Sequence, residues 1–223
     1  ASTFFGLHIG SSALSSFQVA TNTTANNIAN VKTTGYTRQE ATLQAKDAIN
    51  VTARYGSVGT GVTVTSIKQQ RDLYYDNKYW ENNSCYGRYE QKLYYMEQIQ
   101  NYFKDNGSSV KGFSSVFSQM FSDLDTLRSK PSDKTVRNQF ISSAQSLCTY
   151  FNQMSDNLSK LQDDCNEEIR NNVDKINSIS EKISLLNKEI NQIETGTGVE
   201  ASSLRDERAN LIDSLSKIVN VYY

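Results

Sequence analysis

The chain has 223 residues, of which 37% are hydrophobic and 21% are charged, so it is long enough to bury a core in one or two domains. Its 23 lysines and arginines nearly balance its 24 aspartates and glutamates, which excludes the basic surface that nucleic-acid binding requires. One histidine, His8, and three separated cysteines leave almost no material for a histidine-based triad or a tetrahedral zinc site. We therefore expect a protein that is not an enzyme and holds no cofactor or metal.

Hydropathy and cysteine spacing give further exclusions. No apolar run approaches the roughly 20 residues that a membrane-spanning helix needs, so we expect no membrane insertion. Residues 1–16 lack the basic start and compact apolar stretch of a Sec-type export signal. Cys85, Cys148 and Cys165 are odd in number and far apart, which predicts free thiols rather than a disulfide framework.

Residues 3–29 are predicted to form a helix with one apolar stripe. Apolar or small side chains recur there at steps of three or four: Leu7, Gly10, Leu14, Phe17, Thr21, Ala25 and Ile28. Such a helix is marginal alone, so we expect the stripe to be buried against a partner helix. The helix is predicted to end between Asn30 and Gly35, because asparagine and glycine accept left-handed backbone angles at a helix end.

A strand-like pattern replaces the helical one from Thr37 onward. Alternation with a period near two predicts two short strands, one over residues 37–45 and one over 62–67. Residues 55–61, which hold three glycines, are predicted to be a turn-rich approach to the second strand. Their spacing matches neither G-x-G-x-x-G nor a Walker motif, which argues against a phosphate-binding loop.

Four helices are predicted in the remainder of the chain. The first is amphipathic and rich in tyrosine over residues 71–103, and a break at Gly87 is left open; residues 105–112 then form a loop. A short helix follows at 113–127, and Pro131 with Ser132 or Asp133 as the cap introduces the next helix. The last helix returns over residues 204–218, and the chain closes with the strand-like letters VNVYY.

The most regular pattern spans residues 147–193. Leu147, Phe151, Met154, Leu158, Leu161 and Cys165 alternate steps of four and three, and after slips at Ile169 and Ile179 the pattern continues to Ile193. This is a coiled-coil seam, and the slips alter the supercoil without ending the helix. A helix over 133–194 would be on the order of 90 Å long. Residues 195–198, TGTG, are predicted to reverse the chain.

Three other clusters have alternative interpretations. Seven tyrosines between residues 74 and 95 could stack on sugars or bases, but without a basic groove, packing in the core or between subunits is the better interpretation. The acidic pairs at 163–164 and 167–168 are expected on a solvated helix face rather than in acid–base catalysis. The letters RDER at 205–208 predict a local set of ion pairs on the returning helix.

These patterns predict a mainly α fold: an elongated coiled coil or helical bundle with a small β element at about residues 37–70. The expected domains are a core helix and motif at 1–36, a strand-rich connector at 37–70, and a helical-bundle rod at 71–223. The unpartnered first helix, the incomplete bundle and the terminal strand-like segment also lead us to expect a missing carboxy-terminal portion.

Several segments resemble one family. The stretch ANNIANVKTTGY at residues 25–36, followed by Thr37, Arg38 and Gln39, resembles the amino-terminal signature of the bacterial flagellar axial proteins. Within that family, STFFGLHIGSSAL near the start, GTGVTVTSIKQQRD at 59–72 and LRDERANLIDSLSKIVNV at 204–221 resemble the hook-associated members at the junction of hook and filament.

The resemblance implies a structural subunit that leaves the cell unfolded through flagellar type III export and works outside it, at the hook–filament junction. It implies that the first helix pairs with a carboxy-terminal helix, absent from this chain, to line the inner core of the flagellar tube. The implied partners are other copies of the chain in a ring, the hook protein and a second junction hook-associated protein.

The resemblance also assigns contact residues. Leu7, Leu14 and Ile28 would bury their stripe against the absent helix, which predicts that residues 1–35 of the isolated chain are disordered. The contacts with neighbouring subunits would come from a packed joint formed by Asn26, Asn27, Asn30, Thr34, Gly35 and Tyr36. The alternative for this segment is an ordinary helix cap followed by a loop.

Two alternatives for the whole protein remain open at this point. A hook or rod subunit would share residues 26–36 but should lack the long coiled-coil helix. A coiled-coil adaptor or adhesin would fold autonomously and bind a defined ligand without assembling into a tube.

Overall fold

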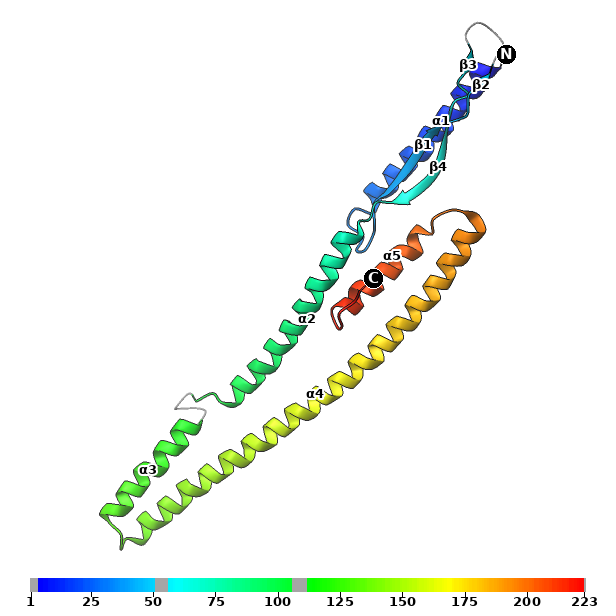
Figure 1. The fold of residues 1–223 in the computed structure, drawn as a ribbon. Helices are drawn as coiled ribbons and strands as arrows, with labels where there is room; N and C mark the ends of the chain where they lie inside the picture. Colours follow the sequence, from blue (N-terminus) through cyan, green and yellow to red (C-terminus); the bar gives the residue numbers. More distant parts are fainter. Residues whose placement is uncertain (1–3, 51–55, 106–111, 223) are drawn as a thin grey trace. The chain divides into compact units, whose positions relative to one another are not determined.

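A computed structural model describes residues 4–50, 56–105 and 112–222. In chain order the elements are α1 (Phe5–Ala29), β1 (Gln39–Ala45), β2 (Ile49–Asn50), β3 (Ser57–Val58), β4 (Val62–Gln69), α2 (Leu73–Tyr102), α3 (Phe113–Ser129), α4 (Lys134–Thr197) and α5 (Ser202–Ser216) (Figure 1). The predicted mainly α class with a small β element is confirmed. The chain divides into two compact units, residues 1–84 with 176–223 and residues 85–175, and each is described by itself.

The β element of the first unit is an antiparallel hairpin. β1 pairs with β4 from Gln39 opposite Gln69 to Ala45 opposite Val62, with a bulge between Thr42 and Leu43. β2 pairs with β3 within the connection between β1 and β4, so the segment predicted as turn-rich contains a short strand at residues 57–58. Tyr55, at the start of that prediction, lies outside the described residues.

The first helix lies along this hairpin (Figure 1). Its docked face mixes small, polar and apolar side chains: Ser16 donates to the carbonyl oxygen of Val62 at 3.2 Å, Ser16 and Thr23 are buried, and Ile9 and Val19 are half-buried. Gly61 has φ +108, and a Cβ there would lie 2.2 Å from Ser12 Oγ, so glycine allows the hairpin to approach the helix closely.

α1 ends close to where the sequence predicts, but by a different backbone. Asn30 caps the helix with φ −99 and its N–H bonds to the Asn26 carbonyl, so it is not left-handed. Only Gly35, with φ +78, adopts the left-handed conformation in this segment.

The helices also differ from prediction at a few ends. α2 continues through Gly87 without a break. Asp133 caps α4, accepting the N–H of Thr135 at 2.8 Å, which agrees with one of the two predicted caps. α4 extends to Thr197, so most of the predicted TGTG loop is helical and Gly198, with φ +68, makes the turn. The described part of the VNVYY segment is not a strand, because no strand pairs with it there.

In the second unit, α3 packs against α4 through aromatic rings. The ring centroid of Phe113 lies 5.9 Å from that of Phe151 and 6.3 Å from that of Tyr150. α2 meets α4 through Glu168, whose carboxylate accepts from Gln91 at 2.5 Å and from the Tyr95 hydroxyl. The hydrogen bond to Glu168 raises the pKa of Tyr95 above its ordinary value.

The predicted coiled-coil seam of α4 is only partly covered. Its buried members are Met154, Leu161, Ile179, Leu186 and Ile190. Its exposed members include Phe151, Leu158, Ile169, Val173 and Ile193. A partly covered seam is typical of a helix that receives further partners.

Candidate functional site

The segment that follows α1 is held by the side chain of Asn27. Asn27 Oδ1 accepts the backbone N–H of Gln39 at 2.9 Å, while Nδ2 donates to the Gln39 carbonyl at 2.8 Å. The Tyr36 hydroxyl donates to the same Oδ1 at 2.8 Å. One amide therefore fixes the first residue of β1 against the last turn of α1, as a backbone pair in a sheet would.

The other two asparagines extend this network. Asn30 Nδ2 donates to the carbonyl and to Oδ1 of Asn26, both at 3.0 Å, and Asn26 Nδ2 donates to the Tyr36 hydroxyl at 3.1 Å. Asn30 Oδ1 accepts from Thr33 at 3.1 Å, and Thr34 is exposed. These amides shape the loop within one chain, and their contact with neighbouring subunits stays a prediction.

Gly35 brings this loop against α5. A Cβ at this position would lie 1.9 Å from Asn210 Oδ1 and 2.1 Å from its Nδ2, so the Asn210 side chain would have to move to admit one. The positive φ of Gly35 and the proximity of Asn210 each favour glycine here.

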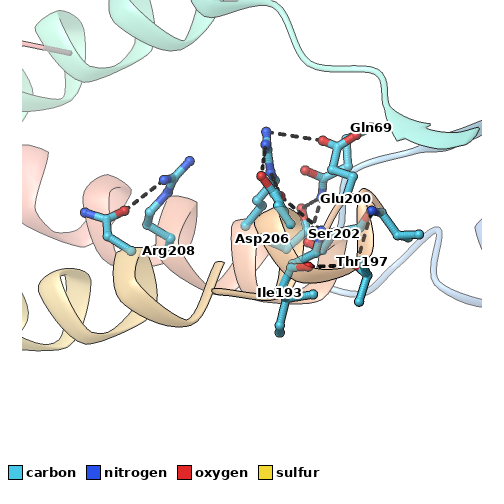
Figure 2. A network of polar contacts seen from close by, with 12 residues as sticks. Gln69, Ile193, Thr197, Glu200, Ser202, Asp206 and Arg208 are labelled. Atoms are coloured by element: carbon cyan, nitrogen blue, oxygen red, sulfur yellow. Dashed lines mark hydrogen bonds and ion pairs between the residues drawn. The ribbon is translucent and has the colours of Figure 1, made fainter. Parts of the chain in front are cut away.

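Asp206 of α5 ties the segment just before β1 and the last residue of β4 to that helix. Its Oδ1 accepts from Gln69 Nε2 at 2.7 Å and its Oδ2 accepts from the N–H of Thr37 at 3.3 Å. Figure 2 shows Gln69 beside Ser202 and Asp206, and the Gln69 amide also donates to the Ser202 carbonyl at 2.9 Å. Asp206 is 9% exposed, so its carboxylate acts in a low-dielectric setting where charged hydrogen bonds are strong.

The turn from α4 to α5 is closed by an ion-pair cluster around Arg205. The Arg205 guanidinium donates to both Glu194 oxygens, at 2.7 and 2.8 Å, and lies 3.3 Å from a Glu200 oxygen. Glu194 also accepts the N–H of Ala201 at 3.1 Å. The hydrogen bond from Arg205 lowers the pKa of Glu194 to about 2. Arg205, the first residue of the RDER segment, thus pairs with two carboxylates that precede the segment.

Trp80 joins α2 to α5 in the same unit. It is 3% exposed, and its indole nitrogen donates to Asp213 Oδ1 at 2.7 Å. Asn83, one turn later, donates to the Asp213 carbonyl at 3.0 Å and to Ser216 Oγ at 2.8 Å. The buried ring and its satisfied N–H make this contact a major anchor of the first unit.

The predicted stripe of α1 lies on the face opposite the hairpin. Leu7, Leu14 and Ile28 are 70%, 71% and 68% exposed, although large apolar side chains normally occupy the buried face of a helix. Beside Ile28, a groove of about 680 Å³ runs between the last turns of α1 and β1; its lining includes Thr23, Asn27, Val31 and Tyr36. This combination is suited to binding another polypeptide rather than to chemistry on a small molecule.

The remaining candidates lie elsewhere. Six of the seven clustered tyrosines are exposed, so they do not form a core of this chain. Of the acidic pairs, Asp163, Asp164 and Glu167 are exposed, whereas Glu168 is half-buried against α2.

Among the described residues, no three histidine, cysteine or acidic side chains could hold a metal together. No helix in the described ranges is long and apolar enough to span a membrane.

Sequence reasoning missed Asp206, Asn210 and Trp80. Asp206 and Asn210 are separated from the hairpin and loop by more than 130 residues, and nothing local marks them as its partners. Trp80 gives a weak signal, since it is the only tryptophan and lies in a helix otherwise rich in exposed tyrosines.

Family models and curated relatives that match this chain are all flagellar proteins. Residues 96–223 match the model described as flagellar hook-associated protein FlgK helical domain, and residues 7–37 match the flagella basal body rod protein model. Flagellar hook-associated protein 1 of Bacillus subtilis is 33% identical over 225 residues, covering 99% of this chain and 44% of that protein. The proteins of the same name from Salmonella typhimurium and Escherichia coli are 33% and 32% identical over 94% of this chain, and 37% and 38% of their own lengths are covered.

The chain thus spans less than half the length of these curated relatives. The helical-domain model covers more than half of the chain, including part of α2 and all of α3, α4 and α5, and the rod-protein model covers most of α1 with the loop after it. The chain belongs to the flagellar hook-associated protein family defined by the FlgK helical domain.

Proposed function

We propose that this chain is a structural subunit of the bacterial flagellum at the junction between hook and filament, and that it acts by packing rather than by catalysis. Family membership and three relatives named flagellar hook-associated protein 1 support the assignment. The observation that carries the assembly role is the apolar stripe of α1, because Leu7, Leu14 and Ile28 are exposed while the opposite face of the helix docks on the hairpin.

The exposed stripe of α1 needs an apolar partner along its length. Burying a leucine or isoleucine side chain stabilises an interface by roughly 1.5–3 kcal/mol, so three such residues give a helix pair a substantial driving force. The partner that the family resemblance implies is a carboxy-terminal helix of the longer protein. Together the two helices would line the core of the flagellar tube.

The loop after α1 would form the joint with neighbouring copies. Asn26, Asn27 and Asn30 hold its shape through bonds within the chain, and Gly35 sets it against α5. A neighbour would meet the groove beside Ile28, whose lining includes Tyr36, together with the exposed Thr34 of the same loop. In this proposal the helix cap and the subunit contact are one structure.

The remaining parts of the proposal concern partners and place. The chain would assemble with other copies of itself in a ring, with the hook protein and with a second junction hook-associated protein, without contacting nucleic acid or entering a membrane. It would reach this extracellular position through flagellar type III export. Residues 1–36 would act as the core helix and motif, 37–70 as the connector and 71–223 as the outer helical bundle.

Immunogold electron microscopy of intact flagella tests the location, with antibody raised against this chain. A narrow band of label between hook and filament is the expected result. Label along the hook or at the rod would instead assign another axial protein. A flagellum without label would overturn the proposal in favour of a coiled-coil adaptor or adhesin.

A matched pair of substitutions tests the contact residues in the full-length protein of the source bacterium. Leu14→Asn removes apolar surface from the exposed stripe, whereas Ser15→Asn alters the adjacent exposed polar position. We expect Leu14→Asn to reduce the number of attached filaments and the swimming speed, with Ser15→Asn close to the parent. Equal motility of the two variants would remove the stripe from the proposed assembly contact.

A further inference from the structure

In the second unit, α2 and α4 meet through polar side chains. Glu168 of α4 uses both carboxylate oxygens, since one accepts from the Gln91 amide at 2.5 Å and the other accepts from the Tyr95 hydroxyl. Gln91 and Tyr95 lie one helical turn apart in α2, and all three side chains are half-buried. We call these three residues the Glu168 clamp. Hydrogen bonds to a carboxylate are strong, so the clamp fixes the turn of α2 that carries both donors.

Glu168 occupies a position where the seam of α4 would otherwise be apolar. A step of three from Cys165 continues the alternation of threes and fours and ends at Glu168, whereas the next apolar residue, Ile169, lies one position later. The structure half-buries Cys165 and Glu168 and leaves Ile169 and Val173 exposed. An acidic side chain therefore takes the inward place at this level of the helix, and the isoleucine beside it does not.

The same inversion occurs on α2. Leu93 lies two residues from both Gln91 and Tyr95, which places it on the far side of the helix. Leu93 and Met96 are 60% and 53% exposed, while the polar pair faces α4. Burial of apolar surface between these two helices alone would favour the opposite orientation, with Leu93 and Met96 against the apolar members of the α4 seam. A different interaction therefore selects the polar face.

We propose that Glu168 selects the face of α2 that packs against α4. Its two acceptors match the two donors of the polar face, whereas the side chains of Leu93 and Met96 offer it no donor. A polar residue at a seam position fixes how helices pair, at a cost in stability. The clamp thereby keeps the apolar faces of α2 and α4 from closing on each other, whichever element covers them. This selection concerns the fold of the second unit and does not depend on the proposed junction role, so the two can fail separately.

Spin-label distances test the selection in the full-length protein of the source bacterium. One label is attached at Glu97→Cys, an exposed position one turn after Leu93 on the same side of α2, and the other at Lys160→Cys, an exposed position of α4. Double electron–electron resonance measures their separation. Turning α2 so that Leu93 faces α4 would carry the first label across the helix and shorten the distance by up to about 10 Å, the diameter of a helix. Native cysteines are replaced by serine throughout, which within this chain means Cys85, Cys148 and Cys165.

Three substitutions at two adjacent positions separate the clamp from general effects. Glu168→Leu removes both acceptors and should shift most of the distance distribution to the shorter value. Glu168→Gln keeps a side-chain oxygen as acceptor and should retain the parent distance. Glu167→Leu is the matched control, because it places the same apolar side chain at the adjacent exposed position, and it should also retain the parent distance. Circular dichroism verifies that each variant keeps its helix content.

Substitution of the donors gives an independent test if Glu168→Leu does not fold. Gln91→Leu combined with Tyr95→Phe removes both donors and should shift the distance distribution in the same direction. Gln100→Leu combined with Tyr94→Phe makes the same changes at exposed positions of α2 and should leave the distance unchanged.

Three results would overturn the proposal. An unchanged distance in a folded Glu168→Leu or in the donor variant would show that the rest of the fold sets the orientation of α2. An equal shift in either control would show that added apolar surface, rather than loss of the clamp, is responsible. A shift in Glu168→Gln as large as that in Glu168→Leu would reject hydrogen bonding as the basis of the selection.

Discussion

Gly35 faces Asn210 so closely that a Cβ on residue 35 would lie 1.9 Å from the Asn210 side-chain oxygen. The same glycine has φ +78, a conformation that costs other residues about 1–2 kcal/mol. Backbone conformation and lack of space therefore favour glycine at this position independently.

Gly35→Ala should destabilise the first unit by about 2–4 kcal/mol, because it adds both backbone strain and a steric clash. Urea unfolding followed by the fluorescence of Trp80, the only tryptophan and a residue of the same unit, measures the change. Gly56→Ala is the control, since Gly56 has φ +69 but, among the described residues other than its chain neighbours, no atom lies within 4 Å of the point that an added methyl group would occupy. Equal losses in the two variants would show that contact with Asn210 contributes nothing.

Asp206→Ala should destabilise the chain by about 1–3 kcal/mol, because the N–H of Thr37 and the amide of Gln69 would lose a buried acceptor. The free energy of unfolding in urea measures the loss. Glu207→Ala removes a carboxylate from the next, exposed position and should change stability by less than about 0.5 kcal/mol. A comparable loss in both variants would mean that general charge, rather than the hairpin contact, is responsible.

The Glu194–Arg205 pair should make the free energy of unfolding depend on pH in the acidic range. Pairing lowers the pKa of folded Glu194 from 4.5 to about 2, so its contribution is complete above pH 4.5 and declines as the pH falls toward 2. In Glu194→Gln this part of the decline should be missing. The difference in unfolding free energy between parent and variant, measured from about pH 6 down to pH 2, should therefore shrink. A constant difference would show that the pair does not hold its charge in the folded state.

Trp80→Ala should destabilise the first unit by about 3–5 kcal/mol, because it removes the most deeply buried aromatic side chain of α2 and leaves Asp213 without its indole donor. Far-UV circular dichroism during thermal unfolding records the change, since the fluorescent reporter is lost. Tyr79→Ala truncates the adjacent exposed ring and should cost much less. Similar melting temperatures for the two variants would contradict the anchoring role of Trp80.

Amide hydrogen exchange should show that α1 is the least protected long helix of the dilute monomer. Its apolar stripe is exposed, and few of its side chains are buried on the hairpin, with Ser16 and Thr23 the buried ones among the described residues. Exchange in α1 should be fast, whereas amides of α5 around Ala209 and Ile212, which are buried, should exchange slowly. Slow exchange along α1 in the monomer would indicate that it needs no assembly partner.

Much of the secondary structure could be predicted from local pattern. The alternation around Leu43 and Val64 predicted the two hairpin strands, and the apolar periodicity after residue 133 predicted the long helix, because side-chain periodicity reflects the backbone directly. The prediction was wrong where local composition misled it. Thr195 and Gly196 are helical despite their low propensity, since the ion pairs of Glu194 with Arg205 stabilise that end.

The helical class, the hairpin, the apolar stripe through Leu14 and the family signature around Asn27 could all be predicted from local sequence, since each depends on neighbours along the chain. The fold alone shows that α1 docks on the hairpin through the face that carries Ser16, and that Asp206 and Asn210 receive the hairpin and its loop. Those contacts with α5 join residues more than 130 positions apart, and their strength comes from burial and close distance, which composition and spacing do not encode.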